Sequence, residues 1–179
     1  MAVTQILIAG FGGQGVLFAG KFLAYKALME EKQLSWLPSY GPEMRGGTAN
    51  CSVTISDEPI GSPIITNPDI LIAMNLPSLE KFENTVVPGG VIFVESTLIE
   101  RKVKRDDVTV YYLPATKIAQ ELGAPGLANM VMTGKLIREC PVVSHDHLED
   151  ALRKVVSSRH ADLLDINLKA IETGYSVNG

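Results

Sequence analysis

Two glycine-rich segments carry the residue types and the spacing best suited to binding a ligand. The first covers residues 10–15 (Gly-Phe-Gly-Gly-Gln-Gly), fits the pattern G-x-G-x-x-G, and lies between an apolar run and a helical pattern. In that context glycines allow a tight turn and a close approach of the backbone to an anion, and the amides that open the helix point toward negative charge. The same glycines would also allow close packing of a helix against a strand, so both interpretations stay open.

The second segment covers residues 39–48 (Ser-Tyr-Gly-Pro-Glu-Met-Arg-Gly-Gly-Thr). Its glycines free the backbone, and a carboxylate, Glu43, stands two residues before a guanidinium, Arg45. Arg45 can pair with a phosphate or a carboxylate through two parallel hydrogen bonds, and Glu43 can orient Arg45 or a base. A solvated loop with a local ion pair explains the same residues equally well, and the residues alone do not decide between the two.

A dinucleotide matches the first segment less well than its glycines suggest. Such a site needs an acidic residue at the end of the second strand to hold the ribose hydroxyls. This sequence has Ser39, Tyr40 and Gly41 there, while Glu30 and Glu31 belong to the end of the preceding helix. A stand-alone domain that binds NAD or a flavin is therefore the less favoured alternative.

The cysteines and histidines do not form a recognisable metal or catalytic centre. Cys51 and Cys140 are the only cysteines, whereas an iron–sulfur cluster or an all-cysteine zinc site needs four thiolates. Cys51 lies in a predicted strand and is expected to be a buried thiol. His145 and His147 stand two residues apart near a helix start, where their side chains would not share a face. We expect no metal site on this chain, and we find no convincing pair of nucleophile and base.

Apolar runs and amphipathic patterns predict the elements that position these segments. Continuous apolar runs are typical of strands covered on both faces, and apolar residues spaced by three and four are typical of helices. The predicted strands cover residues 5–9, 34–40, 49–56, 69–73, 91–94 and 108–113. The predicted helices follow residue 15 and cover residues 77–82, 116–122, 128–139, 146–157 and 162–172. Ser144 is the expected N-cap of the helix 146–157, with Asp146 in its first turn.

Strands that alternate with helices indicate a three-layer, Rossmann-like α/β domain with a mostly parallel sheet and helices on both faces. A turn at residues 58–63 is expected to lead into a further extended segment, which would make part of the sheet antiparallel. We find no internal repeat or linker, so residues 1–179 are expected to form one domain. Ligands of such sheets bind beyond the carboxyl ends of the strands. The sequence places residues 10–15, 40–47, 75–76 and 95–97 there.

The composition of the 179 residues sets limits on partners and location. Only 20% of the residues are charged and the formal net charge is −4, so binding to nucleic acid, which needs clustered Lys and Arg, is disfavoured. The short basic cluster at residues 101–105 is expected to be a solvated loop. No apolar run is long enough to span a membrane and no signal peptide is recognised, so we expect a cytoplasmic protein. The low charge suggests a subunit, and it would also allow the isolated chain to self-associate.

Together, the two glycine-rich segments resemble the gamma subunit of the 2-oxoacid:ferredoxin oxidoreductases. The likeness extends from Gln5 to about Ile171. It includes residues 69–75 (Asp-Ile-Leu-Ile-Ala-Met-Asn), 88–96 (Pro-Gly-Gly-Val-Ile-Phe-Val-Glu-Ser) and 128–134 (Ala-Asn-Met-Val-Met-Thr-Gly). Residues 47–53 and 58–63 look most like the 2-oxoglutarate branch, while the pyruvate, branched-chain and indolepyruvate branches share the core motifs.

The resemblance implies an enzyme that decarboxylates a 2-oxoacid, transfers the acyl group to coenzyme A and reduces ferredoxin. In that family, thiamine diphosphate and its magnesium lie between the alpha and beta subunits, and the beta and, where present, delta subunits carry iron–sulfur clusters. This chain would then be an oxidoreductase subunit that packs on these partners near the active site. It would have no complete active site and bind no cofactor by itself, with coenzyme A as the co-substrate it meets. A purely structural subunit that seals the complex is a further alternative.

The resemblance also implies roles for individual residues. The glycine turn would face a phosphate through Gly12, Gly13, Gln14 and Gly15. The second segment would face the active site through Tyr40, Gly41, Glu43, Arg45, Gly46 and Gly47. Asn129, near a predicted helix start, would hydrogen-bond one of the two loops or serve as a plain helix cap. The pocket for the 2-oxoacid would lie mostly on other subunits, which leaves the identity of the 2-oxoacid open.

Overall fold

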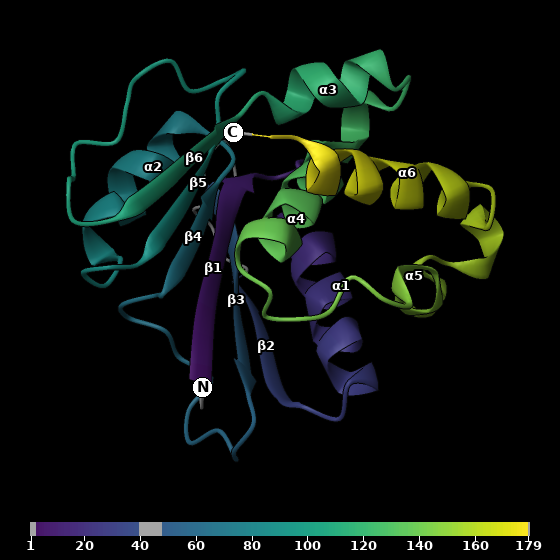
Figure 1. Cartoon of the computed structure of the whole chain (residues 1–179), viewed down its shortest axis with the longest axis horizontal. Helices are drawn as coiled ribbons and strands as arrows, with labels where there is room; N and C mark the ends of the chain where they lie inside the picture. Colours follow the sequence, from purple (N-terminus) through teal and green to yellow (C-terminus); the bar gives the residue numbers. More distant parts are fainter. Residues whose placement is uncertain (1–2, 40–47, 179) are drawn as a thin grey trace.

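A six-stranded sheet forms the centre of the computed structural model, which describes residues 3–39 and 48–178 (Figure 1). The strands are β1 (Val3–Phe11), β2 (Gln33–Ser39), β3 (Thr48–Ser56), β4 (Ile70–Ala73), β5 (Val91–Glu95) and β6 (Thr109–Leu113). Their order in the sheet is β2-β3-β1-β4-β5-β6. β1, β4, β5 and β6 run parallel, and β3 runs antiparallel to β1 and to β2. The predicted α/β class with a mostly parallel sheet is confirmed.

Helices lie on both faces of this sheet, as predicted (Figure 1). One face is covered by α1 (Val16–Met29) and α4 (Ala128–Glu139), and α5 (Leu148–Val155) and α6 (Leu163–Ser176) pack against these two helices. The other face carries α2 (Leu76–Phe82), and α3 (Ala115–Glu121) follows β6. Short 3₁₀ turns cover residues 83–85, 125–127 and 158–160. Within the described residues, no helix has the length and the apolar character needed to cross a membrane.

Each face of the sheet has its own apolar core. Ile6 and Ile8 of β1 belong to the cluster under α1 and α4, whereas Leu7 belongs to the cluster under α2. Burial on both faces explains why the central strands read as continuous apolar runs. β4 is also covered on both faces, since all four of its residues are buried.

The antiparallel part of the sheet differs from the prediction. Residues 57–69 were expected to contain a further extended segment of the sheet, but no strand lies there; β3 itself is the antiparallel strand. Pro59, Pro63 and Pro68 lack the N–H group that a sheet ladder requires, which keeps this segment outside the sheet.

The start of α5 also differs from the prediction, and the N-cap expected at Ser144 was wrong. The helix begins at Leu148, with His147 as its N-cap residue in a left-handed conformation (φ 59°). The Ser144 N–H donates to Glu30 Oε1 at 2.7 Å, and the Ser144 hydroxyl accepts from Lys26 Nζ at 3.0 Å. Ser144 therefore connects the loop before α5 to the end of α1 rather than capping a helix.

Two glycines allow α4 and α6 to cross with their backbones in contact. A Cβ atom at Gly134 would overlap the Ile171 carbonyl oxygen, and one at Gly174 would overlap the Val131 carbonyl oxygen. The obstacle is main chain on both sides, so neither site can adapt by moving a side chain. This crossing fixes how α6 closes the helical layer.

Substitution of Gly134 by Ala should lower the free energy of unfolding by about 1–3 kcal/mol, because the added methyl group must push two helix backbones apart. Urea denaturation followed by circular dichroism measures this change. Gly61→Ala is the control, since a Cβ at Gly61 meets nothing within 4 Å. A Gly134→Ala protein as stable as the wild type would contradict the proposed crossing.

Candidate functional site at the carboxyl edge of the sheet

The turn between β1 and α1 presents free backbone amides at the carboxyl edge of the sheet. Gly15 is the N-cap residue of α1 in a left-handed conformation (φ 72°), and Gly13 also has a positive φ of 92°. No side chain caps the helix and no acidic residue occupies its first turn. The first amides of a helix have no partner within the helix and carry its partial positive charge. The turn can therefore accept an anion.

Gln14 braces this turn from inside. Its Oε1 accepts the Phe11 N–H at 2.6 Å, and its Nε2 donates to the Met74 carbonyl oxygen at 3.0 Å. A Cβ at Gly10 would stand 2.6 Å from Gln14 Oε1, so the glycine leaves room for the amide. Both ends of the Gln14 amide are engaged by the backbone. Its observed contacts hold the ends of β1 and β4 together.

Asn129 connects the glycine turn to α4. Its Nδ2 donates to the Gly15 carbonyl oxygen at 2.9 Å, and the residue is 5% exposed. Of the two roles expected for Asn129, the hydrogen bond to a loop is confirmed; the cap is not, because Leu127 is the N-cap residue of α4. A Cβ at Gly15 would overlap Asn129 Nδ2. Asn129 Oδ1 is buried and has no hydrogen-bond partner in the described part of the chain.

Glu95 organises two further loops at the same edge, a role that the sequence reasoning missed. It is fully buried at the end of β5, where Oε1 accepts the N–H groups of Thr97 and Thr116, each at 3.1 Å. Oε2 accepts the N–H of Leu98 at 3.1 Å. The carboxylate therefore holds the loop after β5 against the start of α3. In the sequence, a glutamate directly after an apolar strand was the feature that could have indicated this role.

A pocket of about 180 Å³ lies where these elements meet. The glycine turn, the end of β4, the loop after β5 and the start of α4 all contribute to it. Its lining residues are Gly13, Gln14, Met74, Leu98, Thr116, Pro125, Gly126 and Ala128. Nearby, Asn75 caps α2 by accepting the Ser78 N–H at 2.9 Å, and both Asn75 Nδ2 and Ser78 Oγ are buried without a partner within the described residues. The edge combines a small pocket with uncommitted polar groups.

The expected second half of the site falls outside the described residues. Tyr40, Gly41, Glu43, Arg45, Gly46 and Gly47 all belong to this group. Their flanking residues are placed: the backbone of Thr48 pairs with Phe11, and Ser39 pairs with Asn50. The second segment thus leaves and rejoins the sheet beside the glycine turn.

A larger pocket, of about 580 Å³, lies at the opposite edge, against the amino ends of β1, β4 and β5. Its walls include Val3, Ile70, Val91, Pro141 and Cys140. Burial raises the pKa of the Cys140 thiol to about 11, so this group is not a thiolate at neutral pH. The smaller pocket is the better candidate site because helix amides and buried polar groups converge there.

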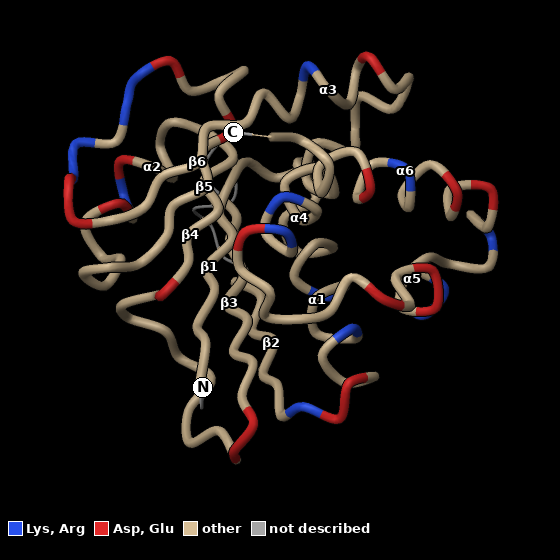
Figure 2. The backbone as a smooth tube through the Cα atoms, viewed as in Figure 1, with Lys and Arg blue, Asp and Glu red and all other residues tan. Residues whose placement is uncertain are grey.

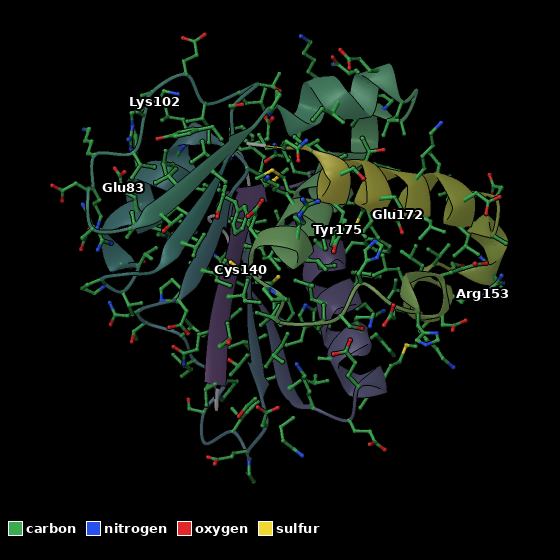
Figure 3. All side chains as sticks on the ribbon, viewed as in Figure 1. Glu83, Lys102, Cys140, Arg153, Glu172 and Tyr175 are labelled. Carbon is green, nitrogen blue, oxygen red and sulfur yellow. The ribbon has the colours of Figure 1, made fainter. Side chains whose placement is uncertain are left out.

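The remaining sequence candidates have structural partners. Burial raises the pKa of Cys51 to about 12, and its Sγ donates to the Val16 carbonyl oxygen at 3.3 Å, which confirms a buried thiol. His145 Nε2 lies 2.8 Å from Glu172 Oε2 and its ring stacks on Tyr175; Figure 3 shows Glu172 and Tyr175 on α6. His147 instead lies near Asp150, at 3.6 Å, so the two histidines do not converge.

The basic cluster 101–105 is more ordered than the solvated loop that was expected. Arg101 pairs with the buried Glu83 at 2.7 Å, and Arg105 pairs with Asp107 at 2.6 Å. The Lys102 ammonium lies 4.0 Å from the centre of the Tyr112 ring. Glu83 and Lys102 both lie on the α2 side of the molecule (Figure 3). These contacts give the cluster a structural role.

Comparison with known proteins gives a consistent result. The model of the pyruvate ferredoxin/flavodoxin oxidoreductase family matches residues 5–177. The chain is 39% identical over 176 residues to the 2-oxoglutarate synthase subunit KorC of Methanocaldococcus jannaschii, covering 97% of this chain and 92% of that protein. It is 40% identical over 172 residues to the ketoisovalerate oxidoreductase subunit VorA of Methanothermobacter marburgensis, covering 96% of this chain and 36% of VorA. The chain thus spans about a third of the length of the ketoisovalerate relatives.

A solved structure agrees with these matches. The gamma subunit of a keto/oxoacid ferredoxin oxidoreductase from Geobacter sulfurreducens superposes with a TM-score of 0.83 at 29% identity. The match covers 96% of each chain.

Replacing Glu95 by Gln should lower the free energy of unfolding by about 1–3 kcal/mol, because an amide cannot accept all the backbone N–H groups that the carboxylate accepts. Chemical denaturation measures the loss. Glu100→Gln, an exposed neighbour, serves as the control. Equal stability of the two variants would show that Glu95 does not hold the loops.

The reaction of Cys140 with iodoacetamide should depend on pH in an unusual way. A thiol with a pKa of about 11 in the folded chain stays protonated where an ordinary thiol has already ionised, so its rate should still rise about tenfold per pH unit above pH 9. Mass spectrometry after timed labelling gives the rate, and Cys140→Ser identifies the contribution of Cys51. A plateau below pH 9 would contradict the raised pKa.

Proposed function

The chain belongs to the pyruvate ferredoxin/flavodoxin oxidoreductase family, and we propose that it is the gamma-type subunit of a 2-oxoacid:ferredoxin oxidoreductase that uses 2-oxoglutarate. The enzyme would oxidatively decarboxylate the 2-oxoacid, form the acyl-coenzyme A and reduce ferredoxin. The observation that carries this proposal is the match to KorC, a 2-oxoglutarate synthase subunit, which extends over nearly the full length of both chains.

The two cysteines of this chain do not fit an iron–sulfur cluster of such an enzyme. Cys51 lies under α1 and Cys140 lies at the opposite edge of the sheet from the glycine turn, so the two cannot ligate one cluster. We assign thiamine diphosphate, magnesium and the iron–sulfur clusters to alpha, beta and, where present, delta subunits, with ferredoxin docking on the assembled complex. We propose that the enzyme works in the cytoplasm, where free thiols such as these two stay reduced.

The carboxyl edge offers groups that suit the phosphates of coenzyme A. Its phosphates require amide donors and positive charge, and the uncapped start of α1 offers both beside the open position of Gly13. When bound, coenzyme A supplies the thiol that accepts the acyl group. This chain would hold its phosphates through the backbone of Gly12, Gly13 and Gly15, which Gln14 and Asn129 keep in place.

The second segment would complete this site from the side of β2 and β3. Arg45 would contact a phosphate and Glu43 would orient the Arg45 guanidinium. The set proposed to contact or shape the site is Tyr40, Gly41, Glu43, Arg45, Gly46 and Gly47. β2 offers no acid for a ribose along Gln33–Ser39, which argues against the alternative of a stand-alone dinucleotide domain.

In the assembled enzyme, Arg45→Ala should raise the Michaelis constant for coenzyme A about 10- to 100-fold, because a charge-assisted hydrogen bond contributes about 1.5–3 kcal/mol. The Michaelis constant for the 2-oxoacid should stay unchanged. Steady-state assays of ferredoxin reduction measure both. Arg153→Ala is the matched control, since Arg153 lies on α5, on the helical side of the molecule (Figure 3). No change in either constant would favour a purely structural subunit.

A further inference from the structure

Glu95 is the one charged residue in the six strands of the sheet. β1 to β4 and β6 contain no Asp, Glu, Lys or Arg, and Figure 2 shows the charged residues mainly on helices and loops. Glu95 lies at the end of β5 and is 0% exposed. Burial of a carboxylate is unfavourable unless hydrogen bonds or a cation compensate its charge. We therefore expect this group to supply something that an apolar residue at the same position could not.

Backbone N–H groups compensate the charge of Glu95. The carboxylate accepts those of Thr97, Leu98 and Thr116, each at 3.1 Å, and the Glu95 carbonyl oxygen accepts the Ile99 N–H at 3.1 Å. Among residues 3–39 and 48–178, no salt bridge includes Glu95. Hydrogen bonds to an ionised carboxylate are stronger than those between neutral groups. The charge of Glu95 therefore fixes main chain rather than another side chain.

Glu95 also supplies the cap that α3 lacks. Pro114, the N-cap residue of α3, makes no side-chain hydrogen bond to the helix. The Glu95 carboxylate instead accepts the Thr116 N–H in the first turn, and Thr97 Oγ1 accepts the Lys117 N–H at 3.2 Å. The loop after β5 and the start of α3 are thus held together as one unit.

Two of the three residues whose N–H groups bind the Glu95 carboxylate line the candidate pocket. Leu98 and Thr116 line it together with Gly13 and Gln14 of the glycine turn, whereas Glu95 itself does not. Leu98 is 48% exposed, so packing restrains it weakly and the hydrogen bond from its N–H restrains the loop instead. Glu95 is therefore placed to fix the distance between this wall and the glycine turn without contacting a ligand in the pocket.

We propose that Glu95 is a positioning residue for ligand binding at the carboxyl edge. It holds Leu98 and Thr116 as one wall of the pocket, and it thereby sets the affinity for a ligand bound between this wall and the glycine turn. The inference rests on the proposed function, which makes coenzyme A the ligand. The affinity for the 2-oxoacid should not depend on Glu95, because the 2-oxoacid pocket is expected to lie mostly on other subunits.

The test compares Glu95→Gln with Glu83→Gln in the assembled enzyme. Both carboxylates are buried and accept a loop N–H, but Glu83 follows the end of α2 that points away from the carboxyl edge (Figure 3). Steady-state assays of ferredoxin reduction give the Michaelis constants, and calorimetry gives the dissociation constant of coenzyme A. We expect Glu95→Gln to raise both constants for coenzyme A about 5- to 20-fold, because a small displacement of the wall weakens oriented contacts. The kcat at saturating coenzyme A, the Michaelis constant for the 2-oxoacid and every constant of Glu83→Gln should stay within about twofold of the wild type.

A double-variant cycle tests whether Glu95 acts through Leu98. Leu98→Ala should raise the Michaelis constant for coenzyme A about tenfold, because the ligand loses an apolar contact. Leu163→Ala, at 42% exposure on α6, is the matched control and should leave that constant unchanged. Glu95→Gln combined with Leu98→Ala should give a constant close to that of the more affected single variant, because coupled residues are not additive. A double variant whose effect is the product of the two single effects would overturn the inference.

Each other outcome has a defined meaning. An unchanged Michaelis constant for coenzyme A in Glu95→Gln overturns the inference, and so does an equal rise for the 2-oxoacid, which would indicate a purely structural carboxylate. Both results leave the proposed function intact, whereas a wild-type complex that neither forms acyl-coenzyme A nor reduces ferredoxin overturns the proposed function. Thermal melting establishes that each variant is folded. Leu98→Ala carries the test if Glu95→Gln does not fold, and an unchanged constant for coenzyme A in that variant counts equally against the inference.

Discussion

The hydrogen bond from the Asn129 side chain to the Gly15 carbonyl oxygen is the contact on which the carboxyl edge depends. It joins two residues 114 positions apart, and it exists only because residue 15 has no Cβ. The turn and α4 must therefore be placed together. The position of α4 depends in turn on α6, which approaches it backbone to backbone at Gly134 and Gly174. The position of the amides in the glycine turn thus depends on glycine at residue 15 and at the crossing of α4 and α6.

Side chains that bond to the backbone hold the rest of this edge. Beyond the strand ends of a parallel sheet, backbone N–H and C=O groups have no neighbouring strand to pair with. Each buried group needs another hydrogen-bond partner. Gln14 does this for the ends of β1 and β4, Asn75 for the start of α2, and Glu95 for the loops after β5 and β6. The side-chain atoms that make these bonds are already paired, whereas amides at the start of α1 and buried atoms such as Asn75 Nδ2 and Asn129 Oδ1 remain able to meet a ligand.

Local sequence patterns predicted most of the strands and helices. They failed where contacts between residues far apart in the sequence determine the structure. The strand at Ile70–Ala73 and the helix at Ala128–Glu139 follow from apolar runs and helical spacing, and the structure has them. Ser144 has the chemistry of a cap, but its contacts with Lys26 and Glu30 could not be read from its neighbours in sequence. The glycine turn and residues 75–76 and 95–97 lie at strand ends as expected, since topology decides that, and binding of a ligand at this edge stays a prediction. The sequence could not show which polar side chains hydrogen-bond to the backbone, because those contacts depend on distances between residues that are far apart in the chain.

The carboxyl edge contains buried polar groups whose partners are missing from the described residues. Asn129 Oδ1, Asn75 Nδ2 and Ser78 Oγ are buried without a partner in the described chain, and each such group costs about 1–3 kcal/mol. Native structures seldom keep such groups unsatisfied, so their partners are expected to come from outside the described residues. A partner chain seated at this edge would exclude water from the glycine turn, which strengthens the hold of its amides on an anion. Assembly and ligand binding would then be coupled through one edge of one sheet.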